Sequence, residues 1–221
     1  MIDNLLSFIA PHHCCGCDKV GSMLCSNCKY HIITEQSDAC IVCSRPCGEA
    51  GKCSSCRVPY DRAWFVGYRR DTLQRLVGLY KFERMRSAYT IIGHLLNSVI
   101  ADIPDSTVVV PVPTVASHVR QRGYDHTLLI ARYIAKRRGL RLSRVLVRST
   151  RTKQRHASAQ TRNAQAKMAF KVDGVINSYV PYLLIDDIMT TGATLKYAAK
   201  ALKDAGATQV WVAIVARQTL D

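Results

Sequence analysis

Residues 183–195, LLIDDIMTTGATL, constrain the possible fold more than any other segment of this chain. Apolar residues lead directly into Asp186 and Asp187, and a threonine-rich loop containing Gly192 follows them. Leu195–Ala205 then shows the spacing of an amphipathic helix. In open α/β sheets, ligands bind beyond the carboxyl ends of parallel strands, where loops lead into helices. The segment therefore predicts a buried strand, a ligand-binding loop and a helix, in that order.

The residue types of this loop predict what it binds. Hydroxyl groups, a glycine that permits close backbone approach and free N–H groups at a helix start form a site for a phosphate monoester. A phosphate would repel two adjacent carboxylates, so Asp186 and Asp187 are expected to accept hydrogen bonds from ribose hydroxyls instead. Together these groups predict a ribose 5-phosphate site, with the phosphate bound by Thr190, Thr191, Gly192, Ala193 and Thr194. The alternative is a buried strand and a capped helix with two acids present by chance. A Gly-rich ATP loop is excluded because no Gly-Lys-Ser/Thr follows.

Strand and helix patterns alternate through the rest of the chain after residue 60. Strands are predicted at residues 61–70, 107–113, 145–147, 182–185 and 209–216. Helices are predicted at residues 73–82, 88–100, 125–138 and 195–205, and Gly206 is expected to end the last of them. This alternation predicts an α/β domain with a parallel-rich sheet over residues 61–221.

All ten cysteines lie between Cys14 and Cys56, in a segment too short and polar to form a core without metal. Four Cys-x2-Cys pairs can supply two zinc sites of four thiolates each, because two intervening residues let one turn aim both sulfurs at one ion. The expected ligands are Cys14, Cys17, Cys25, Cys28, Cys40, Cys43, Cys53 and Cys56. Sequential and interleaved pairings both fit, and Cys15 and Cys47 are left over. A disulfide framework is the rival interpretation and suits secreted proteins. Residues 1–60 are thus expected to form a Cys-rich, structural or partner-binding module.

The formal net charge of +15 is concentrated in one stretch of sequence. No Asp or Glu lies between His126 and Val172, which indicates a surface that meets polyanions such as single-stranded DNA or diphosphate. The longest apolar runs are too short to span a bilayer, and the first residues lack the basic start of a secretory signal. We therefore expect a cytoplasmic protein without a membrane span.

The segment from Ile185 to Thr194 resembles the signature of type I phosphoribosyltransferases, which bind phosphoribosyl diphosphate (PRPP). A second segment, Val110–His126 (VPVPTVASHVRQRGYDH), is similar to the VPVP…R-x-R-G-F-N-Q motif of the ComF family of competence-associated proteins. Further matches to that family are Arg120, Arg122, Gly123, Tyr124, the LYKF around Lys81, Thr152, Gln154, Arg162 and Phe170. With the Cys pairs and the threonine-glycine loop, the resemblance covers nearly the whole chain. It implies the type I phosphoribosyltransferase fold behind a zinc module.

Three positions depart from the ComF pattern. Asp125 and His126 stand where Asn and Gln are usual, and Gln165 stands at a position usually held by Asn. An Asp in place of Asn loses the amide donor and adds charge, which would disfavour an anionic ligand. These departures count against ligand contacts at the three residues and leave the prediction for the PRPP loop unchanged.

The resemblance implies a transferase that uses PRPP with Mg²⁺ and a nitrogen nucleophile, which sequence does not name. Asp186 and Asp187 would hold the ribose, with the metal as a second candidate partner. The diphosphate would meet Pro113, Thr114, Val115, Arg120, Arg122 and Lys81, with Arg151, Lys153 and Arg155 on a flap. The competing hypothesis is a non-catalytic protein of DNA uptake and transformation. Such a protein would bind single-stranded DNA or competence and recombination proteins, and would sense PRPP or retain only its pocket.

Overall fold

The computed structural model describes residues 12–34, 39–83, 85–148 and 170–218. The elements in chain order are α2 (Ser26–Thr34), β1 (Arg62–Tyr68), α3 (Asp71–Lys81), α4 (Ala88–Val99), β2 (Val108–Pro111), α5 (Ala116–Arg122), α6 (His126–Arg138), β3 (Arg141–Leu142), β4 (Leu146–Arg148), β5 (Phe170–Val172), β6 (Tyr182–Met189), α8 (Ala193–Asp204) and β7 (Val210–Arg217).

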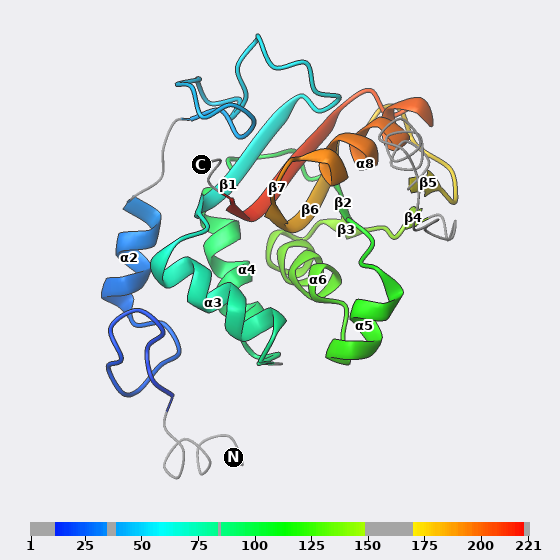
Figure 1. Ribbon diagram of the computed structural model, residues 1–221. Coiled ribbons are helices and arrows are strands. Elements are labelled where there is room, and N and C mark those ends of the chain that lie inside the picture. The colour runs from blue at the N-terminus through cyan, green and yellow to red at the C-terminus, as the bar shows by residue number, and fades with distance from the viewer. Residues whose placement is uncertain (1–11, 35–38, 84, 149–169, 219–221) are drawn as a thin grey trace, which may run out of the picture.

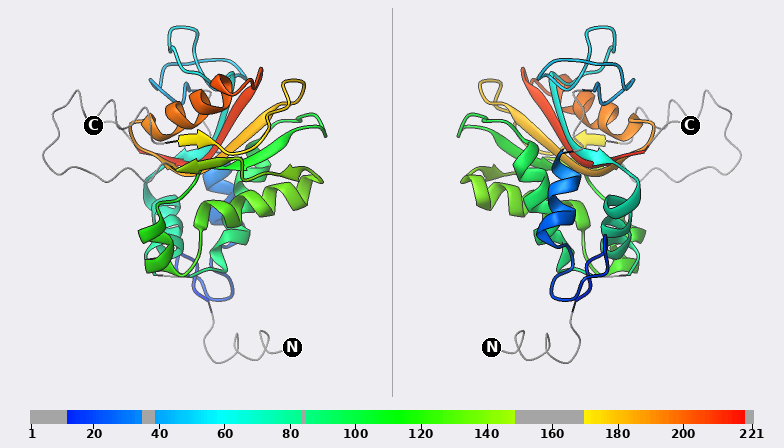
Figure 2. Two further views of the ribbon diagram at one scale, coloured as in Figure 1. Left: turned by 90° about the vertical axis from the view of Figure 1, so that its right-hand side faces the viewer. Right: turned by 90° about the vertical axis from the view of Figure 1, so that its left-hand side faces the viewer.

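A five-stranded parallel sheet forms the centre, in the order β1-β7-β6-β2-β3 (Figure 1). Strands β2 and β7 are buried along their whole length, as expected of strands covered on both faces. Helices α2, α3, α4 and α6 lie on one face and α8 on the other (Figure 2). The α/β fold and the parallel-rich sheet are therefore confirmed.

Two core clusters fill the spaces on either side of the sheet. The first joins α3, α4 and α6 to the sheet and also takes in Met23, Leu24 and Ile32 from the Cys-rich segment. The second joins α8 to the opposite face and includes Ile41 and Tyr60. The two Cys-containing stretches thus pack on opposite sides of the sheet, as Figure 1 also shows. A domain boundary at residue 60 stays a prediction.

Strand β6 continues four residues beyond its predicted end at Ile185, because β7 continues to pair with it. Asp186 pairs with Ile214 and Met189 with Arg217, whereas the pairing of β2 with β6 ends at Pro111 and Ile185. The predicted strand therefore ends too early. Asp186 and Asp187 lie in the strand, at the point where one of its two neighbours has ended.

Helices α2 and α5 and strands β3 and β5 were not predicted. None of the residues of α5 is buried, so the segment lacks the apolar periodicity that reveals a helix. Strand β3 has two residues and carries no pattern of its own. In the described part of the chain, no helix is long and apolar enough to cross a membrane.

Candidate ligand site and metal centres

The chain changes direction across the sheet between β2 and β6. From β2 the next strand of the sheet is β3 on one side, and from β6 it is β7 on the other side. Ligands of open α/β sheets bind at such a switch point, outside the carboxyl ends of the strands. The residues that follow β2 and those that end β6 therefore define the candidate ligand site.

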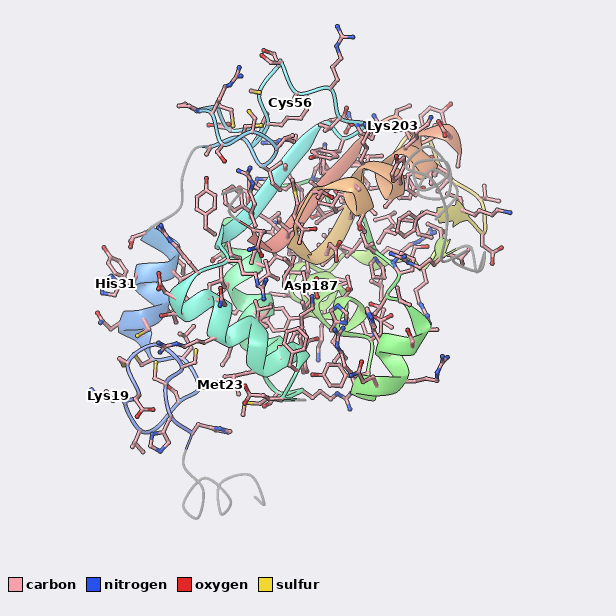
Figure 3. The ribbon with its side chains drawn as sticks, in the orientation of Figure 1. Lys19, Met23, His31, Cys56, Asp187 and Lys203 are labelled. Carbon is pink, nitrogen blue, oxygen red and sulfur yellow. The ribbon has the colours of Figure 1, made fainter. Side chains whose placement is uncertain are left out.

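Asp187 is the centre of the buried charges at this point. Its Oδ2 atom lies 2.8 Å from Nζ of Lys81 at the end of α3, and 2.5 Å from Nε2 of His126 at the start of α6. Figure 3 shows Asp187 at the end of β6, where these helices approach the sheet. Burial alone would raise the pKa of Asp187, but the hydrogen bond from His126 and the nearby positive charges hold it well below its usual value. Asp187 is therefore ionised in the folded protein.

His126 is fixed from three sides. Nη1 of Arg122 lies 3.0 Å from His126 Nδ1, and the Tyr80 hydroxyl donates to the His126 carbonyl at 2.7 Å. The Tyr124 hydroxyl donates in turn to the Tyr80 carbonyl. Because α5 ends at Arg122 and α6 begins at His126, the short turn between them brings the guanidinium to the imidazole.

Asp186 occupies a different environment from its neighbour. Successive strand residues point to opposite faces, and Asp186 pairs with Ile214, whose side chain belongs to the cluster on the α8 side. Its Oδ1 atom accepts a hydrogen bond from the Asp187 amide at 2.8 Å. Burial and the charge of Asp187 raise the pKa of Asp186 to about 8, although Lys81 and Arg148 oppose the shift. One acid is thus ionised while the other retains a proton near neutral pH.

The loop after β6 has the geometry of an anion site. Gly192 has a φ of 75° and stands immediately before α8, a left-handed conformation that favours glycine. Thr190 and Thr191 are exposed and Thr194 is half-buried. The first amides of a helix have no partner within it and carry the positive end of the helix dipole. The predicted phosphate residues Thr190, Thr191, Gly192, Ala193 and Thr194 therefore surround the start of α8.

The loop after β2 is tied to the start of α6. The Thr114 hydroxyl donates to Asp125 Oδ1 at 2.9 Å, and the same oxygen accepts the Leu128 amide at 3.1 Å and caps the helix. Asp125 therefore has a structural role that accounts for its carboxylate. Pro113 and Val115 flank Thr114, and the Pro113 carbonyl accepts from Arg148 Nε at 3.4 Å.

The structure thus brings together some of the predicted site residues and adds others. Lys81 contacts Asp187 directly and Arg122 reaches it through His126, whereas Arg120 is exposed on α5. The predictions missed His126, Tyr80 and Arg148; the departure of His126 from the ComF pattern was the signal that could have revealed the first. Arg151, Lys153, Arg155 and Gln165 lie outside the described residues.

The cysteines form two groups of four, and the pairing is sequential. The thiol sulfurs of each group lie within 4.8 Å of one another, with Cys14, Cys17, Cys25 and Cys28 in one and Cys40, Cys43, Cys53 and Cys56 in the other. Individual Sγ–Sγ distances are 3.6 Å for Cys17–Cys25 and 3.5 Å for Cys43–Cys53. A tetrahedral zinc ion with Zn–S bonds of ~2.3 Å requires sulfurs about 3.8 Å apart, and the described cysteines are free thiols. Both groups therefore fit a structural zinc ion.

Backbone amides stabilise the thiolate form of the first ligand in each group. Burial alone would raise the pKa of Cys40, but the amides of Cys43, Cys53 and Val42 lower it to about 6. The amides of Cys25, Cys17 and Gly16 do the same for Cys14, whose pKa also falls to about 6 against the effect of burial. Because zinc binds the thiolate form, the lowered pKa of these two cysteines favours zinc binding at both sites.

Comparison with known proteins places these features in a family. The model of the phosphoribosyl transferase domain matches residues 88–219. Competence protein F of Haemophilus influenzae is 24% identical over 223 residues, which cover 87% of this chain and 96% of that protein. DNA utilization protein YhgH of Salmonella typhi is 27% identical over 205 residues, covering 85% and 88% of the two chains.

Solved structures show more distant similarity. The allosteric regulatory enzyme of purine biosynthesis is 23% identical with a TM-score of 0.43; the match covers 58% of this chain and only 25% of that enzyme. Orotate phosphoribosyltransferase from Aeropyrum pernix is 22% identical with a TM-score of 0.39, covering 65% and 64% of the two chains.

Proposed function

Since the chain belongs to the ComF family of type I phosphoribosyltransferase-domain proteins, we propose that it binds PRPP with Mg²⁺ between the ends of β2 and β6. The observation that carries this proposal is the position of Asp186 and Asp187. They lie at the switch point of the sheet, a few residues before the Gly192 turn that opens α8. Ribose hydroxyls would bind the acids and the 5-phosphate would bind at the helix start.

The contacts of the two acids indicate which oxygen atoms would accept the ribose. Lys81 and His126 occupy Oδ2 of Asp187, and Oδ1 accepts the Ile188 amide at 2.5 Å. A carboxylate oxygen has two acceptor sites, so Oδ1 keeps one for a hydroxyl. Asp186 uses only Oδ1 in the described contacts, which leaves its second oxygen for the neighbouring hydroxyl.

The cations near Asp187 support a diphosphate at the other end of the ligand. Arg122 reaches this region from the end of α5, and the ammonium of Lys81 is held against Asp187. When bound with the diphosphate, Mg²⁺ would neutralise charge that develops on the leaving group. Lys81 and Arg122 would fix the diphosphate and thereby hold C1 of the ribose in position.

Calorimetry with Mg-PRPP tests the binding site. The wild-type protein should bind, and Asp186→Ala combined with Asp187→Ala should weaken binding at least tenfold. The control is Asp204→Ala at the far end of α8, which should bind as the wild type does. Equal affinity in the double variant would refute the assignment of the acids.

Turnover is the next step of the proposal. In it, an amine or ring nitrogen displaces diphosphate from C1 of PRPP, and the acceptor is unidentified. PRPP-dependent release of diphosphate, measured across a panel of bases and amines, tests it. If none of the acceptors in the panel supports diphosphate release while PRPP binding is intact, the result would favour a protein that senses PRPP without consuming it.

The names of the relatives suggest the cellular process, which we propose is DNA uptake and transformation in the cytoplasm. The acid-free basic stretch between His126 and Val172 supports contact with single-stranded DNA. Gel shifts should show binding that weakens steeply as salt rises. Absence of any complex at low salt would remove DNA as a direct partner and leave competence or recombination proteins as the alternative.

A further inference from the structure

Arg217, the last residue of β7, is a buried cation without a described counter-charge. Its side chain is only 1% exposed. Among the ion pairs of the described residues, none involves Arg217. A buried charge without an opposite charge is costly, and the Tyr68 ring, whose centroid lies 5.8 Å from Arg217 Cζ, offsets only part of that cost because it carries no net charge.

The hydrogen bonds of the Arg217 side chain lead to the second cysteine group. Nη1 donates to the Cys40 carbonyl at 3.2 Å and to the Ser44 hydroxyl, and Nη2 donates to the Val42 carbonyl at 2.9 Å. These acceptors lie in the turn that carries Cys40 and Cys43. The guanidinium therefore connects this turn to the end of β7 by hydrogen bonds.

Val42 connects the guanidinium to a zinc ligand. Its carbonyl accepts from Arg217 at 2.9 Å, and its amide donates to Cys40 Sγ at 3.4 Å. A shift of the guanidinium would therefore move the residue that holds the sulfur. A zinc ion bound by four thiolates would carry a formal charge of −2 and would supply the opposite charge beside the guanidinium.

Arg217 also lies beside the loop of the ligand site. It pairs in register with Met189, the last residue of β6, and the next amide, from Gln218, donates to the Met189 carbonyl at 2.8 Å. Thr190 follows Met189 directly. A displacement of Arg217 would therefore reach the start of the loop through these two residues.

We propose that Arg217 links the second zinc site to the ligand loop: the zinc tetrathiolate balances the buried guanidinium, and the guanidinium holds the ends of β7 and β6 in place. Loss of zinc from Cys40, Cys43, Cys53 and Cys56 then loosens the loop after Met189. The first cysteine group lacks such a buried cation in the described structure; Arg75 reaches the Cys15 carbonyl at 3.4 Å from an exposed position.

Hydrogen exchange with mass spectrometry, during titration with a zinc chelator, tests this proposal without any activity assay. In Arg217→Met, residues 39–58 should lose their protection from hydrogen exchange at a chelator concentration at least tenfold lower than in the wild type. This is the size of effect typical of residues that contact metal ligands without binding the metal. Residues 12–34 should respond as in the wild type. Residues 186–195 should lose protection together with residues 39–58. Arg75→Met is the matched control and should leave residues 39–58 unchanged.

Two results would overturn the proposal. One is that residues 39–58 of folded Arg217→Met lose protection at the same chelator concentration as in the wild type. The other is full protection of residues 186–195 after zinc has left the second site. If Arg217→Met does not fold, the titration of the wild type tests whether loss of zinc affects the loop. Arg217→Lys, which keeps the positive charge but not the planar guanidinium with its several donors, then tests whether the guanidinium is required. In Arg217→Lys, residues 39–58 should still lose protection at a lower chelator concentration than in the wild type.

Discussion

His126 Nε2 lies 2.5 Å from Asp187 Oδ2, and Nη1 of Arg122 lies 3.0 Å from the other ring nitrogen, Nδ1. The imidazole therefore stands between a cation on α5 and an anion on β6. A single side chain at the start of α6 thus connects α5 to the end of β6.

Replacement of His126 tests the bridge. In His126→Leu the buried carboxylate of Asp187 loses one of its two side-chain partners, which should destabilise the protein by about 1–3 kcal/mol. His126→Gln offers a carbonyl acceptor to Arg122 and an amide donor to Asp187, so it should retain most of that stability. Urea unfolding of the three proteins provides the comparison. If the Gln and Leu variants were equally unstable, the bridging geometry would not be the source of the effect.

Asp186 should give the protein an unusual dependence of stability on pH. Its pKa is raised from 3.8 to about 8 by burial and by the charge of Asp187. Between these values the folded protein holds a proton that the unfolded chain has released, so stability falls as pH rises. Asp187 has a lowered pKa and contributes stability that is lost only below its unfolded value of 3.8, outside this window.

The comparison of wild type with Asp186→Asn isolates this dependence. Asn keeps the acceptor for the Asp187 amide and does not titrate. From pH 6 to pH 8 the wild type should lose stability relative to the variant, with a slope of at most about 1.4 kcal/mol per pH unit. Urea unfolding at several pH values measures it. Parallel curves for the two proteins would show that Asp186 is ionised throughout.

Gly192 should be required for both the loop conformation and the ligand. In Gly192→Ala the residue keeps a φ of 75°, and its Cβ would lie 3.0 Å from Met189 Cε. We expect a loss of about 1–2 kcal/mol in stability, and weaker binding of PRPP as the loop shifts. Gly206→Ala is the control, since its φ is 105° with no atom near the added Cβ. It should lose stability but bind PRPP as the wild type does; equal binding by both variants would argue against a phosphate at this turn.

The sequence predicted the elements whose burial is periodic or complete. Strands β2, β6 and β7 and helices α3, α4, α6 and α8 all lie close to their expected positions, because apolar residues mark their buried sides. Helix α5 has no buried side, and the extension of β6 depends on β7, so local patterns could not reveal either.

The site was predicted from residue types, but its contacts depend on the fold. Lys81 and Asp187 are far apart in the sequence, and the contacts of Asp187 with Lys81 and of His126 with Asp187 and Arg122 follow from the meeting of α3, α5, α6 and β6. The spacing of the Cys pairs fixed the number of ligands at each zinc site. It could not choose between sequential and interleaved pairs, because both bring four sulfurs together.

Adjacent cysteines provide the sharpest test of the zinc assignment. Cys14 belongs to the first group of four, whereas the Cys15 thiol points to the Thr72 carbonyl at a distance of 4.0 Å. Metal analysis of the wild type should find about two zinc ions per chain. Cys14→Ser should lose one of them and unfold at a lower temperature, because Met23, Leu24 and Ile32 share a core with the sheet. Cys15→Ser should keep both ions. Loss of one zinc ion in Cys15→Ser, with both ions kept in Cys14→Ser, would show that Cys15 is the ligand in place of Cys14.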